Sequence, residues 1–237
     1  MAALAIDRCD GGPALNSDSE LQVVAEGGRM RVLAVCVGIP EDRPGKTVRT
    51  GIHKQPINFA MSVTAEGLED DAVCNRKHHG GPEQALCVEG NITRLWWEGL
   101  LNKAIPPGFF GENLCIEGLD NRIVALGDHF SIGNVVLEAT APRMPCRTLC
   151  EWLGDPAFAK RYLTAARPGF YCRVIESGRI AAGSSLKYEP FEGDRILLSE
   201  MMKHHGKRAS PDLIHRYLTV PVHAKVRASL AQGSIKS

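Results

Sequence analysis

The feature that most limits the fold of this chain is a series of short apolar segments, separated by glycine-containing turns, between residues 30 and 186. The first segment, residues 30–38, is rich in β-branched side chains and ends in Gly-Ile-Pro, which stops a strand. Further strands are predicted at residues 84–88, 123–126, 129–132, 135–140 and 170–176. Many short strands with glycine-rich turns are typical of a β-barrel or a β-sandwich.

Two stretches inside this region have helical rather than strand spacing. Residues 91–102 begin with a helix-capping asparagine and carry large apolar side chains three and four positions apart. Residues 147–166 have the same spacing, and Asp155-Pro156 is expected to break that helix in two because proline does not fit a helix interior. We therefore expect a few helices around a mostly β domain.

The pattern changes after residue 190, where three short helices are predicted at residues 194–205, 211–219 and 221–231. Pro211 and Pro221 suit the first position of the second and third helix. At the other end, residues 1–29 are rich in Gly, Ser and Asp and lack any periodicity. The sequence thus predicts a flexible N-terminal arm at 1–29, a β domain at 30–190 and a three-helix extension at 191–237.

Composition excludes several classes of protein. Lys and Arg number 28 against 27 Asp and Glu, so charge gives no reason to expect nucleic acid or an anionic membrane as a partner. No apolar run reaches the roughly 18 residues of a membrane span, and the first residues lack the pattern of a secretory signal. The eight cysteines include no Cys-x-x-Cys pair of a zinc knuckle or a thioredoxin-like site. We expect a cytoplasmic protein with reduced thiols.

Five short strings stand out when they are taken together and in order: TGIHKQP at 50–56, HHGGP at 78–82, FGENL at 110–114, LGD at 126–128 and PRMPC at 142–146. In this order and spacing they resemble the MOSC family, named for the C-terminal domain of molybdenum cofactor sulfurase. The resemblance covers roughly residues 30–188 and is greatest to stand-alone bacterial members linked to N-hydroxylaminopurine detoxification. The tail after residue 190 resembles the three-helix extension of that branch.

The resemblance implies a mostly β barrel that binds a molybdopterin-type molybdenum cofactor, with Cys146 as the single protein ligand to the metal. It also implies an oxidoreductase that reduces small N-hydroxylated compounds. The sequence carries no signature of haem, flavin or an iron–sulfur cluster, so an external electron-donor protein of flavoprotein or ferredoxin type is expected. The sequence is compatible with a homodimer.

The chain departs from the family pattern at four places near the expected site. Asp70 stands where relatives usually have glycine before an aspartate, and Cys74 begins a segment in which they often have an aspartate. Relatives often carry Tyr or His where this chain has Val88-Glu89-Gly90, and commonly a lysine where it has Thr148.

Cys146 is the candidate with the most support from its neighbours. A thiolate is a good ligand for a borderline-soft metal, and both the nearby Arg143 and a helix start would stabilise that thiolate. Pro142 and Pro145 stiffen the loop that holds it. The plainer interpretation is a buried structural cysteine, and for Cys150, one helical turn later, core packing is favoured.

Phosphate and pterin groups call for cationic and hydrogen-bonding side chains. Arg143 is the preferred anion-binding residue, and each of the others has the alternative of being a solvated surface residue. Asn113 offers both a donor and an acceptor to a pterin edge, while Glu112 is interpreted as pinning loop amides and Asp128 as stabilising a turn. The further candidates for binding the cofactor are Arg147, Lys77, Thr50 and Lys54.

His79 is predicted as the catalytic proton carrier, because imidazole titrates near neutral pH. Gly80 and Gly81 follow it and would let the backbone approach a ligand closely. Zinc bound by Cys74 and His78 is a weaker alternative, since no second ligand pair lies nearby. Three rival functions are open at this point: a non-catalytic cofactor carrier, a sulfur-transfer protein with persulfide on Cys146, and an interaction module that docks through its three C-terminal helices.

Overall fold

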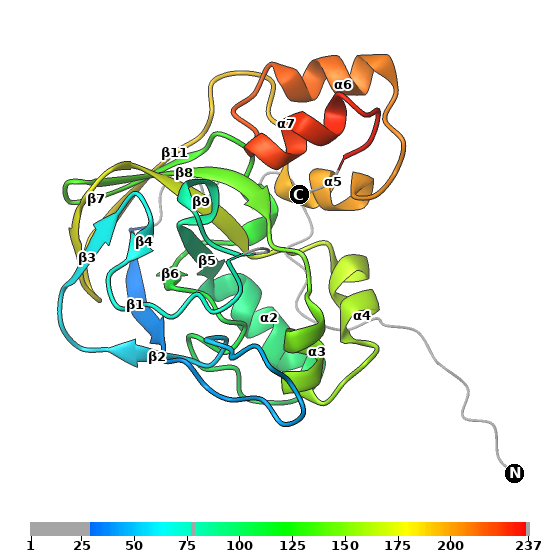
Figure 1. Ribbon diagram of the computed structural model, residues 1–237. Helices are drawn as coiled ribbons and strands as arrows, with labels where there is room; N and C mark the ends of the chain where they lie inside the picture. Colours follow the sequence, from blue (N-terminus) through cyan, green and yellow to red (C-terminus); the bar gives the residue numbers. More distant parts are fainter. Residues whose placement is uncertain (1–28, 77–78, 236–237) are drawn as a thin grey trace, which may run out of the picture.

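The computed structural model describes residues 29–76 and 79–235, so residues 1–28 of the predicted N-terminal arm lie outside the described residues. The structure confirms a mostly β fold, with a closed barrel at its centre (Figure 1). Seven strands form the barrel: β1 (Met30–Gly38), β5 (Leu86–Gly90), β6 (Leu114–Glu117), β7 (His129–Ile132), β8 (Val135–Pro142), β9 (Phe170–Glu176) and β11 (Ser185–Glu189). Their order is β11-β7-β8-β9-β5-β6-β1, and β1 pairs back with β11.

β1 divides one of its edges between two partners. Its first two residues pair with β11 and close the barrel, whereas its last four pair with an eighth strand, β2 (Lys54–Ile57). Its other edge pairs with β6 across a bulge between Val32 and Ala34. A small separate sheet is formed by β3 (Met61–Thr64), β4 (Gly67–Leu68) and β10 (Gly178–Ile180).

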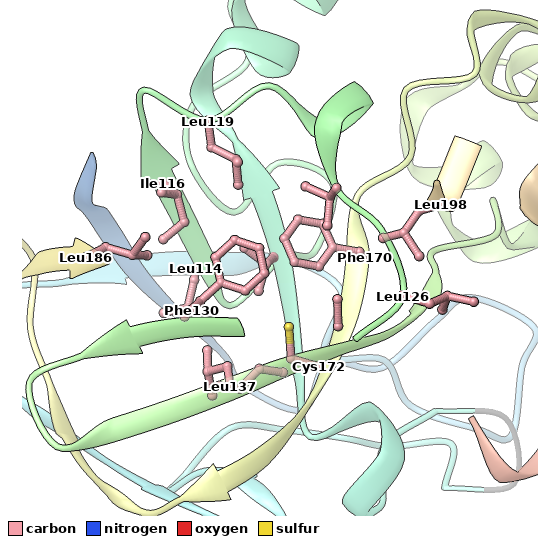
Figure 2. Close-up of a cluster of buried hydrophobic side chains, with 14 of the residues drawn as sticks. Leu114, Ile116, Leu119, Leu126, Phe130, Leu137, Phe170, Cys172, Leu186 and Leu198 are labelled. Carbon is pink, nitrogen blue, oxygen red and sulfur yellow. The ribbon is translucent and has the colours of Figure 1, made fainter. Parts of the chain in front are cut away.

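The barrel is filled by apolar side chains that its strands direct inward. Figure 2 shows such residues from several strands meeting in one cluster, among them Leu114, Phe130 and Phe170, each of which is almost completely buried. Phe130 and Phe170 stack with ring centroids 5.3 Å apart. Burial of each such side chain contributes roughly 1.5–3 kcal/mol, so this cluster is a large source of stability for the barrel.

Helices flank the barrel on two sides (Figure 1). In the described part of the chain these are α2 (Asn91–Leu101), α3 (Arg147–Leu153), α4 (Phe158–Ala165), α5 (Leu198–His204), α6 (Pro211–Leu218) and α7 (Ala224–Leu230), with short 3₁₀ turns η1 (Pro82–Gln84) and η2 (Asn121–Ile123). The first three share a second apolar cluster, in which Trp97 stacks on Tyr162 at 5.7 Å. No helix among the described residues has the length and apolar character needed to cross a membrane.

The C-terminal helices share the core of the barrel. Leu198, Met201 and Val226 belong to the same buried cluster as the barrel interior, and Figure 2 shows Leu198 together with the barrel side chains. Asp128, in the turn before β7, is fully buried and strengthens this junction. It accepts hydrogen bonds from the Phe191 amide at 2.8 Å and the Arg195 guanidinium at 2.8 Å. The predicted boundary at residue 190 is therefore a change of structure type within one shared core.

Most of the predicted elements are present, and the exceptions have physical reasons. The predicted strand at 123–126 is wrong: η2 ends at Ile123 and only Ala125 forms a bridge, to Leu197. The strand predicted at 84–88 begins later, at Leu86, because Gln84 ends η1. Pro211 does occupy the start of α6, but Pro221 precedes α7 by three residues, and the His223 side chain caps that helix.

The predicted break at Asp155-Pro156 is confirmed. α3 ends at Leu153, where Gly154 forms the C-cap with a left-handed φ of +64°, and α4 begins after Ala157. The Asp155 carboxylate accepts the Ala157 amide at 2.9 Å and so stabilises the turn between the two helices. The break fixes the direction of α3, whose first turn carries the site described below.

Candidate functional site

The main cavity of the described residues has a volume of about 350 Å³ and lies where the β1–β2 loop, the segment at 71–80 and the start of α3 converge. Gly38 and Gly51 allow this convergence. A Cβ on Gly38 would lie 2.3 Å from the Gly51 carbonyl oxygen, and one on Gly51 would lie 2.1 Å from the Ala72 carbonyl oxygen. Of the residues predicted from the sequence, seven line this cavity: Thr50, Lys54, His79, Gly80, Asn113, Arg143 and Cys146.

Three predicted residues are not brought into the cavity or cannot be placed. The Arg147 side chain is 82% exposed and pairs with Glu151 on its own helix at 2.8 Å, so the structure does not support its prediction as a cofactor contact. Gly81 is absent from the cavity wall but has a φ of +81°, which glycine adopts easily. Lys77 lies outside the described residues.

Cys146 occupies the N-cap position of α3, half-buried at the wall of the cavity. Its Sγ accepts a hydrogen bond from the Leu149 amide at 3.4 Å. A charged sulfur accepts such a bond more strongly than a neutral one, so this position suits a thiolate ligand. Cys87 also lines the cavity, but burial raises the pKa of its thiol to about 12, so it stays protonated.

Arg143 is the buried cation of the cavity. Only 6% of the residue is exposed, and its Nη1 atom is buried without a hydrogen-bond partner among the described residues. No carboxylate in that part of the chain lies within ion-pair distance of it, although Arg143 carries a full charge at any physiological pH. A buried, incompletely paired guanidinium is costly unless an anion completes its environment. The part of the cavity wall that Arg143 forms is therefore suited to a negatively charged group.

Lys54 and Asn113, both predicted to contact a cofactor, are engaged by the protein itself. Lys54 forms a buried ion pair with Asp71, and Asp71 also accepts the Gly38 amide at 2.8 Å and the Asn113 Nδ2 group at 2.9 Å. The Asn113 Oδ1 atom accepts the Cys87 amide at 3.0 Å. These two side chains thus hold the ends of β1, β2 and β5 together at the cavity wall.

Two buried carboxylates lie behind Arg143. Glu112 accepts the Gly108 and Phe110 amides at 2.6 and 3.0 Å, which confirms the interpretation that it pins loop amides. Glu89 is 1% exposed and accepts Asn121 Nδ2 at 2.5 Å. Burial, reinforced by the neighbouring Glu112, raises the pKa of Glu89 well above its usual range. Burial also raises the pKa of Glu112.

His79 lines the cavity and is partly buried. Burial lowers its pKa below the usual range, and the positive charges of Arg143 and Lys225 lower it further. The imidazole is therefore neutral at pH 7. The neutral imidazole has one donor and one acceptor nitrogen, so it can take up a proton. To donate a proton to a substrate, the imidazole must first become charged.

Several cavity residues were not singled out by the sequence reasoning. Asp71, Tyr171 and Gln84 line the cavity, as do the cations Arg43 and Lys46 on the β1–β2 loop. Asp71 follows the unusual Asp70 in the sequence, and that departure from the family pattern was a usable signal. Tyr171 lies in a strand whose periodicity indicates core packing and nothing more.

The described residues contain no group of three or more His, Cys, Asp or Glu side chains that could hold a metal ion. A metal held at this cavity by the described residues would therefore take at most two such protein ligands and would need others from a cofactor. Cys146 meets that requirement, and Arg143 offers the charge that an anionic cofactor needs. The donor set thus fits a molybdopterin-type group.

Comparisons with known proteins agree with this architecture. The MOSC domain pattern matches residues 75–187. The uncharacterized protein YflK of Bacillus subtilis (strain 168) is 34% identical over 161 residues, which cover 67% of this chain and 73% of YflK. A protein named "Reductase" from Gibberella moniliformis (strain M3125 / FGSC 7600) is 29% identical over 147 residues, 60% of this chain but only 26% of that protein.

Among solved structures, that of YiiM from Geobacillus stearothermophilus superposes with a TM-score of 0.71 at 23% identity. The match covers 86% of this chain and 98% of that one. The sequence match to YflK and the domain match agree with this likeness. The chain belongs to the MOSC domain family.

Proposed function

We propose that this protein binds a molybdenum cofactor in the 350 Å³ cavity and reduces N-hydroxylated compounds with electrons from an external donor protein. The observation that carries the proposal is the buried Nη1 of Arg143, which has no partner among the described residues and lies in the same cavity as the half-buried Cys146. A molybdenum cofactor has an anionic part and a metal. Binding it requires a cation for the anionic part and a thiol for the metal in one cavity. The name of the Gibberella relative supports the reductase class.

The chain's own residues have distinct tasks in this proposal. Cys146 would hold the metal through its sulfur, and Arg143 would hold an anionic part of the cofactor. When bound, the cofactor supplies a two-electron redox centre. Gly80, with a φ of +77°, lets the backbone pass close to the bound group.

His79 is the residue in the cavity wall best suited to move a proton. Reduction of an N–OH bond releases water and consumes protons, so a carrier near the reacting atoms is needed. The lowered pKa means that His79 is neutral at pH 7 in the surroundings that the protein itself provides. An anion bound beside Arg143 would offset the positive field that lowers this pKa and would bring the imidazole closer to its working range.

The electron donor in this proposal is a separate flavoprotein or ferredoxin-type protein, and the substrate is a small molecule. All seven cysteines of the described residues are free of disulfides, which suits the reducing cytoplasm. Activity in a mixture of the loaded protein, an N-hydroxylated substrate and NADH, without any donor protein, would contradict this part of the proposal.

The proposal is tested by the metal and pterin content of the protein purified from a host that makes the cofactor. The wild type is expected to contain both, Cys146→Ser to lose the metal, and the matched control Cys150→Ser to keep it. Cys150 is also partly buried, but unlike Cys146 it does not line the cavity.

Wild-type protein that carries neither metal nor pterin after the cofactor is supplied would overturn the proposal. If the loaded protein reduces no N-hydroxylated compound with any donor, the protein is a cofactor carrier and not a reductase. Sulfane sulfur on Cys146, detected by mass spectrometry, would indicate sulfur transfer in place of the proposed reductase function.

A further inference from the structure

Residues 79–84, which we call the His79 segment, bring His79 to the cavity wall without forming a β-strand. Gly80 and Gly81 take left-handed φ values of +77° and +81°, which a strand does not use. The backbone hydrogen bonds of the segment are local: the His79 amide donates to the Asn75 carbonyl at 3.0 Å, and the Gln84 amide to the Gly81 carbonyl at 2.9 Å. Contacts with other parts of the protein must therefore help to fix where His79 lies.

Glu83, in η1, joins the His79 segment to the barrel. Its carbonyl oxygen accepts the hydroxyl of Thr140, a fully buried residue of β8, at 2.7 Å. Its carboxylate pairs with Arg173 of β9 at 3.3 Å. Arg173 is itself held, because its guanidinium also pairs with Glu138 of β8 at 3.2 Å. These contacts place η1 against strands β8 and β9.

The same carboxylate reaches the C-terminal helices. The Glu83 Oε2 atom accepts the amide of Ala224, the first residue of α7, at 3.1 Å. The first amides of a helix have no partner within the helix, so an acceptor from elsewhere satisfies this one. The buried His223 accepts the amide of Lys225 in the same way, at 2.9 Å. A contact between residues 141 positions apart thus ties the start of α7 to the His79 segment.

Arg173 adds a second connection to the same place. Its Nη2 atom donates to the Pro221 carbonyl, three residues before α7, at 3.2 Å. About a quarter of the Arg173 side chain and of the Glu83 side chain is exposed, so solvent weakens their ion pair without removing it. The His79 segment, the barrel and the start of α7 therefore share one network of hydrogen bonds.

Helix α7 also acts on His79 through its charge. Burial lowers the pKa of His79, and the positive charges of Arg143 and Lys225 lower it further. Lys225 is the second residue of α7. A displacement of α7 would move this charge, and a displacement of η1 would expose the imidazole. Either change would bring the pKa of His79 closer to its ordinary value of about 6.5.

We propose that Glu83 is a positioning residue, whose carboxylate couples the start of α7 to the His79 segment, so that the C-terminal helices help to set the geometry of the cavity. Glu83 does not line the cavity, and it acts through the segment that carries His79. The inference rests on the proposed function where it concerns turnover. The coupling itself belongs to the protein without cofactor and is measured there.

The test breaks the contact from each side. Glu83→Ala removes the acceptor, and Ala224→Pro removes the donor without changing any charge. Proline fits this place because it is the first position of α7, and because His223 before it has the extended ψ of 138° that proline requires. Hydrogen exchange followed by mass spectrometry should show residues 79–84 exchanging about tenfold faster in both variants. NMR titration of the His79 imidazole should give a higher pKa than in the wild type.

Two further variants separate positioning from general stability. Glu138→Gln removes the other carboxylate that pairs with Arg173, so it should lower the melting temperature without changing the exchange of residues 79–84 or the pKa of His79. Glu83→Gln keeps an acceptor oxygen and should restore most of the slow exchange.

Turnover is measured in the cofactor-loaded protein, with acetohydroxamic acid as substrate and reduced methyl viologen as donor. Because His79 is proposed to move protons, Ala224→Pro should lower kcat more than it raises KM.

The inference is overturned if residues 79–84 exchange as slowly in Glu83→Ala and Ala224→Pro as in the wild type, or if Glu138→Gln loosens them equally. Neither result touches the proposed function, which depends on the loaded protein reducing N–OH bonds. Loaded protein that reduces nothing, together with a loosened segment in both variants, would keep the coupling and remove the reductase.

Discussion

Arg143 and Cys146 show how single residues set the chemistry of the cavity. The guanidinium is buried before any ligand arrives, and that arrangement lowers stability in the absence of an anion. The Cys146 sulfur occupies the N-cap of α3 at the cavity wall and accepts the Leu149 amide at 3.4 Å. In both cases one side chain provides a chemical group that suits the proposed cofactor.

Replacement of this buried cation should separate stability from binding. Arg143→Met removes an incompletely paired charge while keeping much of the side-chain volume, so we expect the free energy of unfolding of the cofactor-free protein to rise by about 1 kcal/mol. Pterin content after purification should fall sharply. Urea denaturation and pterin fluorescence are the measurements. Arg147→Met, on the exposed start of the same helix, is the matched control and should alter neither. A large loss of stability in Arg143→Met would make Arg143 a structural residue.

Glu89 predicts a particular dependence of stability on pH. Its pKa is raised in the folded protein by burial and by Glu112, so the folded state holds this proton to a higher pH than the unfolded state. Below a pH of about 4.3, the pKa of Glu89 in the unfolded chain, the protonated side chain contributes its full stabilisation. As the pH rises from there towards the pKa of Glu89 in the folded protein, the free energy of unfolding falls by at most about 1.4 kcal/mol per pH unit. Glu89→Gln should therefore lose less stability between pH 5 and pH 8 than the wild type.

Urea denaturation across that pH range measures this difference. The exposed Glu192→Gln is the control and should follow the wild type. Parallel curves for the wild type and Glu89→Gln would show that Glu89 does not hold its proton in the folded protein.

At the scale of elements, the sequence pattern predicts helices and strands correctly where nearby residues determine the secondary structure. Residues 30–38 became β1, and the Asp155-Pro156 break separates α3 from α4. The pattern failed where long-range contacts decide. Residues 123–126 are apolar because they pack under the C-terminal helices, and buried coil has the same composition as a buried strand.

The same distinction applies to the site. Five strings in order indicate Cys146, Arg143 and His79, which share one cavity, but no local pattern marks Tyr171, which the pairing of β9 with β5 and β8 brings to that cavity. Asp70 was visible as a departure from the family pattern, and its φ of +61° shows why glycine suits that position. That Arg147 turns away from the cavity depends on the orientation of α3 about its axis, which the sequence does not specify.

The junction between the barrel and the C-terminal helices depends on Asp128. Its carboxylate is fully buried and accepts hydrogen bonds from the Ala125 and Phe191 amides, the Tyr188 hydroxyl and the Arg195 guanidinium. Asp128→Asn replaces two acceptor oxygens by one and removes the charge opposite Arg195, so we expect it to lower the free energy of unfolding by about 3 kcal/mol. Asp42→Asn, on a side chain that is 92% exposed, should lower it by less than about 0.5 kcal/mol. Denaturation by urea measures both, and equal effects would refute the assignment.

The whole molecule behaves as one core with two kinds of secondary structure. Side chains of α5 and α7 are buried among those of the barrel, so the C-terminal helices are part of what holds the barrel together. A chain that ends at residue 190 should therefore lose its cooperative thermal transition or unfold far below the full-length protein. Circular dichroism and calorimetry of the truncated chain test this. A truncated chain with the Tm of the full-length protein would assign the helices to partner docking instead.

The division of one β1 edge between β11 and β2 has a consequence for how the sequence of such a protein can evolve. The barrel closes through the first part of β1, while the loop at 39–53 extends from its far end and carries Arg43, Lys46 and Thr50 to the main cavity. Apart from the bridge between Glu41 and Thr50, this loop contributes no strand pairing. Insertions, deletions and exchanges in it can therefore accumulate without disturbing barrel closure. Grafting this one segment between family members is a direct route to new substrate ranges on an unchanged scaffold.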